Sequence, residues 1–80
     1  MPDVPDEVIE WCRAFAEAAG ADPPTDQEID DLLALAAIAA HASARQAAPI
    51  TCWLAARGGM TASAALAAAQ RVEIASRKRP

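Results

Sequence analysis

Alanine, which occupies 23 of the 80 positions, constrains the fold of this chain more than any other feature of its sequence. Alanine has the highest helix propensity of all residues because its side chain loses no conformational freedom in a helix. Residues that favour strands are scarce: there is no Tyr, one Phe, and no stretch in which Val or Ile alternates with polar residues over the length of a strand. The sequence therefore predicts an all-α fold.

The same alanine content leaves few bulky side chains for a hydrophobic core. Subtracting the 23 Ala and two Cys from the 43 hydrophobic residues leaves 18 larger apolar side chains. Burial of apolar surface contributes about 25 cal/mol per Å², and a chain of 80 residues is near the lower size limit for one core. We therefore expect a single domain over residues 1–80 that gains stability from a protein partner or as a homo-oligomer.

The charges are distributed unevenly along the chain. The net charge is −4, but residues 1–31 carry ten acids and one base, a sum of −9, and residues 32–80 carry one acid and six bases, a sum of +5. The simpler explanation is that acidic residues stabilise the N-termini of the first helices. The alternative is that this dipolar distribution serves head-to-tail self-association or attracts a basic partner.

Nothing in the sequence indicates a targeting or membrane segment. The N-terminus is acidic, unlike the start of a secretory signal, and the longest apolar run, Leu32–Ala40, is about half a membrane span. Cys12 and Cys52 form no C-x-x-C pair, and with one His they supply too few ligands for a zinc site. We expect both cysteines to be reduced and buried, and the protein to be cytoplasmic.

Capping residues divide the chain into four helices. Gly20 suits the left-handed position after the first helix, Thr25 and Glu28 form a capping-box pattern before the second, and Thr61 suits the N-cap of the fourth. Pro49 suits the first turn of a short third helix. The predicted helices cover about residues 6–19, 26–47, 49–57 and 62–76, before a basic tail at 77–80. We expect the long second helix to be central and to pack against the other three.

We expect the aromatic side chains to belong to the core. The first helix has an apolar stripe about 100° wide, formed by Val8, Trp11, Cys12, Phe15 and Ala19. In the third helix, Trp53 is expected to face inward with Ile50 and Leu54. With so few other aromatic residues, the tryptophans are needed in the core, although tryptophans also anchor interfaces.

The second helix is apolar on two almost opposite sides. One side carries Ile29, Leu32, Leu33, Ala36 and Ala40, and the other carries Leu35, Ile38 and Ala42. A helix with two apolar sides is either central or shared with a partner. Leu35 and Ile38 are therefore candidate contacts to a partner.

The sequence contains no recognisable catalytic apparatus. His41 is the one imidazole, and no spacing places a cysteine and an orienting carboxylate beside it. Gly58-Gly59-Met60 lacks the Lys and the repeated glycines of a phosphate-binding loop. We expect no enzymatic activity, no cofactor and no metal.

His41 and Arg45 form the most suggestive polar pair. Four positions apart on the predicted second helix, they precede the start of the third, where unpaired N–H groups and an Arg would bind an anion. The simpler interpretation is that Arg45 stabilises the C-terminus of the second helix while His41 lies between helices. The three bases at residues 77–79 are a weak signal for nucleic acid, and we expect them to be a solvated helix end.

The stretch from Leu32 to Leu54 resembles a family of small domains of unknown function from high-GC bacteria. In that family a Trp-containing first helix precedes a long helix and the pattern A-H-x-x-x-R-x-x-A-P-[LI]-x-x-[FYW]-L. The matching residues here are Ala40, His41, Arg45, Ala48, Pro49, Ile50, Trp53 and Leu54. Trp11, Phe15 and the Pro-Pro-Thr turn also fit, so the resemblance covers most of the chain.

The resemblance implies a biological setting rather than a mechanism. Members of the family occur alone or fused behind the nucleotidyltransferase that makes molybdopterin-guanine dinucleotide. We therefore expect a non-catalytic accessory or protein-interaction module linked to molybdenum-cofactor maturation, with that transferase or a molybdoenzyme as its partner. The alternatives are a small domain that binds a phosphate-bearing pterin or nucleotide through His41 and Arg45, and a nucleic-acid-binding regulator.

Overall fold

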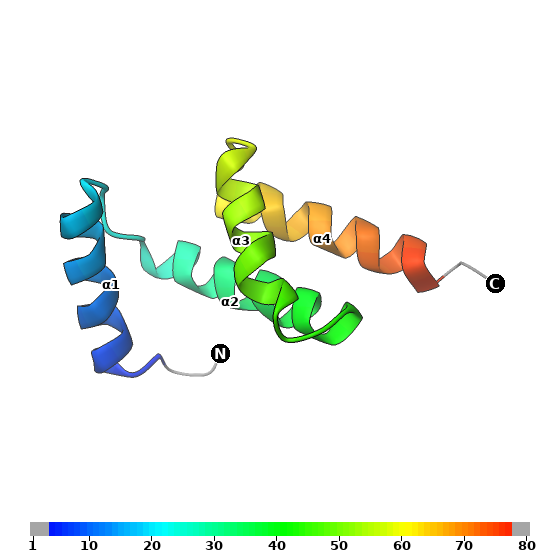
Figure 1. Ribbon diagram of the computed structural model, residues 1–80, viewed down its shortest axis with the longest axis horizontal. Coiled ribbons are helices and arrows are strands. Elements are labelled where there is room, and N and C mark those ends of the chain that lie inside the picture. Colours follow the sequence, from blue (N-terminus) through cyan, green and yellow to red (C-terminus); the bar gives the residue numbers. More distant parts are fainter. Residues whose placement is uncertain (1–3, 78–80) are drawn as a thin grey trace.

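The computed structural model describes residues 4–77, and these residues form four helices and no strand (Figure 1). The helices are α1 (Asp6–Ala19), α2 (Asp26–Ala42), α3 (Ala47–Arg57) and α4 (Ala62–Arg77). The all-α prediction and the number of helices are confirmed for this part of the chain. Of the predicted basic tail, residues 78–80 lie outside the described residues.

The predicted capping residues define helix ends as expected. Gly20 follows α1 with a left-handed φ of 70°. At the start of α2, the Glu28 amide donates to Thr25 Oγ1 at 3.1 Å and the Thr25 amide donates to Glu28 Oε1 at 2.8 Å, which completes the capping box. Thr61 Oγ1 accepts a hydrogen bond from the Ala64 amide at 3.1 Å, so Thr61 caps α4.

The predicted boundary between the second and third helices is wrong. We expected the second helix to reach residue 47, but α2 ends at Ala42 and α3 already begins at Ala47. Pro49 explains the difference, because proline is tolerated only in the first turn of a helix and its ring clashes with the carbonyl group four residues earlier. A helix that includes Pro49 must therefore begin after Arg45, and residues 43–46 form the turn between the two helices.

Helix α2 is the centre of a three-helix body, with α3 and α4 each packed against it. In Figure 1, α1 lies at the N-terminal end of α2, to one side of α3 and α4. We expected α2 to pack against all three other helices, but α1 has no comparably extensive contact with any of them. The radius of gyration is 13.5 Å, whereas a compact chain of this length has about 12 Å.

The connection between α1 and α2 explains why α1 stands apart. Pro23 and Pro24 lie in it, and each proline restricts the residue before it to extended conformations. The segment from residue 21 to residue 25 is accordingly not helical, and Figure 1 shows it as an extended connection. A short connection of this kind holds α1 at a distance from the body instead of letting it fold back.

The core is smaller than the sequence indicates. The buried hydrophobic side chains are Ala16, Ile29, Leu35 and Ala65. The prediction that the tryptophans belong to the core is wrong, since Trp11 is 70% exposed and Trp53 is 60% exposed. Cys12 and Cys52 are free thiols as expected, but both are half-buried and not fully enclosed.

Candidate functional site

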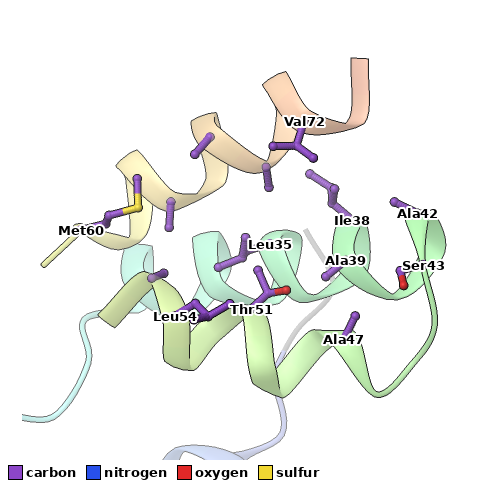
Figure 2. A pocket seen from close by; sticks show the side chains of 14 residues that line it. Leu35, Ile38, Ala39, Ala42, Ser43, Ala47, Thr51, Leu54, Met60 and Val72 are labelled. Atoms are coloured by element: carbon purple, nitrogen blue, oxygen red, sulfur yellow. The ribbon is translucent and has the colours of Figure 1, made fainter. Parts of the chain in front are cut away.

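The body contains a groove with α2 as its floor and α3 and α4 as its walls (Figure 2). Its volume is about 360 Å³. Leu35 and Ile38 of α2 point into it from the floor, Leu54 of α3 and Val72 of α4 from the walls, and Met60 closes one end. We call this hollow the α2–α4 groove.

The α2–α4 groove exists because short side chains line two of its helices. Ala39 and Ala42 of α2 and Ala65, Ala68 and Ala69 of α4 fill less space than the leucines or isoleucines of an ordinary core. Helices α3 and α4 are consecutive, but each packs mainly on α2 and not on the other. The alanine content that favours helices thus leaves the space between α3 and α4 unfilled.

The lining of the α2–α4 groove is almost entirely carbon. None of its residues is charged, and its polar side chains are the hydroxyls of Ser43 and Thr51. Figure 2 shows these two oxygens and the Met60 sulfur among carbon atoms. Such a surface favours an apolar side chain over a phosphate group, because a buried charge needs paired hydrogen-bonding partners.

An exposed apolar patch continues from the groove along α3. Ile50 is 59% exposed, Trp53 60% and Leu54 54%, and Leu54 also lines the groove. The Arg57 guanidinium lies over the Trp53 ring, 5.0 Å from its centroid. Apolar side chains that remain this exposed next to a hollow mark interaction surfaces. We call Ile50, Trp53 and Leu54 the α3 patch.

Helix α1 presents a second exposed apolar surface. Trp11 is 70% exposed and Phe15 is 62% exposed, and their rings stack with centroids 6.5 Å apart and an interplanar angle of 19°. Val8 continues the same face at 39% exposure. These three residues, which we call the α1 ridge, belong to the five-residue stripe that the sequence predicted to be buried. In the structure the buried residue of α1 is Ala16.

The candidate contact residues on α2 have different environments. Leu35 is 1% exposed, so it belongs to the core beneath the groove and offers no surface to a partner without a change of structure. Ile38 is half-buried and lines the groove. The second apolar side of α2 is therefore covered at Leu35 and open at Ile38.

His41 and Arg45 do not share a helical face. His41 lies in the last turn of α2, whereas Arg45 lies in the turn before α3, and both are exposed. Arg45 directly precedes Gln46, the N-cap residue of α3. The spacing that suggested an anion site assumed one continuous helix from residue 26 to residue 47, and that helix is interrupted.

Reactive groups contribute little to this surface. Partial burial raises the pKa of the Cys52 thiol above its usual value, which keeps it protonated and weakly nucleophilic at neutral pH. Among residues 4–77 no cluster of three or more His, Cys, Asp or Glu side chains could hold a metal ion. Within the same residues, no helix combines the length and apolar character needed to cross a bilayer.

Sequence reasoning missed the exposure of Trp11, Phe15 and Trp53. A usable signal was present: the chain has few large apolar side chains, and α4 offers mostly alanine methyl groups toward them. Large aromatic rings on two helices cannot all be covered by a third helix that presents methyl groups. Val72 of α4 is also exposed, at 66%, where it lines the groove.

Comparison with known proteins gives a family but no activity. The family described as "Domain of unknown function (DUF6457)" matches residues 3–79, nearly the whole chain. No curated protein and no solved structure matches this sequence. The chain belongs to the DUF6457 family.

Proposed function

We propose that this member of the DUF6457 family is a non-catalytic protein-interaction module. The observation that carries the proposal is the exposure of Trp53 and Leu54 beside the uncharged α2–α4 groove. Large apolar side chains that stay more than half exposed cost solubility, and tryptophan in particular is enriched where proteins bind one another. The module acts by presenting a preformed apolar surface, and no step of chemistry is assigned to it.

The groove indicates the type of segment that a partner contributes. An open groove with two helical walls and an apolar floor accepts an amphipathic helix, whose side chains at positions i, i+3 and i+4 enter it. Arg45, Arg57 and Arg71 belong to the helices and turn around the groove, so an acidic flank on the incoming helix is favoured. The partner surface that we propose is therefore an acidic, amphipathic helix of another protein.

The finer proposal concerns the biological setting. The resemblance of the segment Leu32–Leu54 to domains fused with the molybdopterin-guanine dinucleotide nucleotidyltransferase supports a role in molybdenum-cofactor maturation in the bacterial cytoplasm. Fusion raises the effective concentration of two domains for each other, which is of use when the domains bind one another. We take the transferase as the first partner to test.

A binding experiment with the transferase tests this proposal. Calorimetric titration of the purified transferase should give a dissociation constant below about 100 µM, a value that most specific contacts reach. Trp53→Ala should weaken the complex by about tenfold or more, whereas Leu33→Ala, at a site that is 50% exposed but outside the groove and the α3 patch, should not. No binding at that concentration, or equal losses in both variants, would contradict the proposal.

A further inference from the structure

Helix α1 has the properties that the α2–α4 groove requires of a ligand. It is amphipathic, with the α1 ridge of Val8, Trp11 and Phe15 exposed on one side. Its charged residues are Asp6, Glu7, Glu10, Glu17 and one base, Arg13, which sum to −3. An acidic helix with an exposed aromatic face and an open apolar groove therefore occur in the same chain.

The two surfaces also match in length. Val8 and Phe15 are seven residues apart on α1, and Leu35 and Ala42, which bound the floor of the groove on α2, are also seven residues apart. At a rise of 1.5 Å per residue, each distance is about 11 Å. The ridge can thus lie along the floor without extending past it.

Charge favours the same pairing. Residues 43–75, which form α3, most of α4 and the turns that precede them, carry Arg45, Arg57, Arg71 and Glu73, a sum of +2. The acidic residues of α2 lie at 26–31, before the floor of the groove begins at Leu35. An incoming helix with a charge of −3 is therefore attracted to the region around the groove.

The helix that enters the groove cannot easily come from the same copy. Pro23 and Pro24 stiffen the connection between α1 and α2, and Figure 1 shows α1 at the N-terminal end of α2, apart from α3 and α4. A second copy meets no such restriction. From these observations we infer that the chain self-associates by docking the α1 ridge of one copy into the α2–α4 groove of another.

Reciprocal exchange of α1 closes this arrangement as a dimer. Each copy then supplies one ridge and accepts one, so that the same contact forms twice around a two-fold axis. A single helix in a groove buries less than the roughly 800 Å² per partner that a stable interface needs, and the second contact makes up the difference. The inference rests on the proposed function in one respect: both assign a binding role to the α2–α4 groove. A partner protein and a second copy of the chain would therefore compete for it.

The association is tested by sedimentation and light scattering of the purified full chain, with no second protein present. The wild type should form a concentration-dependent dimer between about 10 and 200 µM, the range of modest interfaces. Trp11→Asp combined with Phe15→Asp should raise the dissociation constant by about tenfold or more. Both positions are exposed and belong to the helix outside the body, so the body should keep its fold and its melting temperature.

A matched pair of substitutions on α4 tests the groove. Val72 is 66% exposed and lines the groove, whereas Ile74 is 49% exposed on the same helix and does not line it. Val72→Glu should weaken the dimer by about tenfold through repulsion of the acidic α1, Val72→Lys should weaken it less, and Ile74→Glu should leave it unchanged. Equal effects of Val72→Glu and Ile74→Glu would overturn the assignment of the groove.

Mixing the two defective proteins gives the decisive result. The α1 variant keeps an intact groove and Val72→Glu keeps an intact α1 ridge, so the mixture can form one of the two contacts. Its heterodimer should therefore have a higher dissociation constant than the wild-type dimer but a lower one than the homodimer of either variant. A mixture that associates no more tightly than the separate variants, or a wild type that stays monomeric at about 200 µM, overturns the inference. Because this experiment involves no transferase, its failure is separate from failure of the proposed function.

Discussion

The guanidinium carbon of Arg57 lies 5.0 Å from the centroid of the Trp53 ring, one helical turn away on α3. A cation over an aromatic face at an exposed site contributes about 0.5–1 kcal/mol. The contact therefore restrains the indole while 60% of its surface remains accessible. A restrained exposed aromatic ring loses little conformational entropy when a partner covers it, which suits Trp53 to the α3 patch.

Trp53 should matter less to stability than a much smaller side chain in the core. We expect Trp53→Ala to lower the free energy of unfolding by no more than about 1 kcal/mol, because burial of the indole is incomplete. Leu35→Ala removes the most completely buried large side chain, at 1% exposure, and should cost about 2–5 kcal/mol. Urea titrations followed by circular dichroism compare the two. The reverse order of stability would show that the indole is buried in solution.

The capping box of α2 gives a second stability prediction. Thr25→Ala removes the acceptor for the Glu28 amide and should lower the free energy of unfolding by about 1 kcal/mol. Thr25→Ser keeps the hydroxyl acceptor and should leave the free energy of unfolding unchanged or slightly higher, because serine is at least as good an N-cap residue as threonine. Chemical denaturation of the two variants measures the difference. Identical curves for Ala and Ser would mean that the cap contributes nothing to the start of α2.

Cys52 should react slowly with thiol reagents near neutral pH. Desolvation of its partly buried thiol raises its pKa, so the fraction of reactive thiolate at a given pH is smaller than for a free thiol. In a Cys12→Ser background, the pH midpoint of Cys52 alkylation should lie above that of glutathione. Because the folded state favours the protonated thiol, the contribution of this group to stability is fully present below the unfolded pKa and is lost as the pH rises through the higher folded-state pKa. Denaturation midpoints that increase in this alkaline range would contradict the assignment.

The local structure of this chain was readable from its sequence because it depends on neighbouring residues. Thr25 and Thr61 accept hydrogen bonds from backbone amides in the first turn of their helices, and Gly20 adopts the left-handed conformation that ends α1. Their positions predicted helix ends within a residue or two. The predicted end of α2 is too late because the ring of Pro49 clashes with the carbonyl group four residues earlier, so that the turn before α3 must lie upstream of Ala47.

Burial was predicted poorly because it depends on which helices meet. The apolar stripe on α1 has the spacing of a face that packs in a core, yet its residues are exposed. Spacing alone does not say whether the surface that covers such a stripe belongs to the same copy of the chain or to another protein. The stiff Pro23-Pro24 connection decides that question for α1. For α3, the extent of burial depends on the alanines of α4. Larger residues at these positions would have reached α3 and covered Leu54, whereas the alanines leave a groove.

Filling the α2–α4 groove should separate stability from association. Ala68 lies on its α4 wall, and Ala68→Leu adds apolar volume inside a hollow of about 360 Å³. Burial of the added carbons should leave the free energy of unfolding unchanged or raise it by up to about 2 kcal/mol, because the space is open and no neighbour must move. The same side chain occupies the site that the α1 ridge is proposed to fill, so the dimer should weaken by about tenfold or more.

The matched control is Ala67→Leu, one position earlier on the same helix and outside the groove. It adds the same carbons to an exposed position, and we expect it to change neither the dissociation constant nor the melting curve by a measurable amount. Light scattering and thermal denaturation of the two variants give both quantities from the same samples. A dimer that tolerates Ala68→Leu as well as Ala67→Leu would show that the groove is not the site of association, whatever the effect on stability.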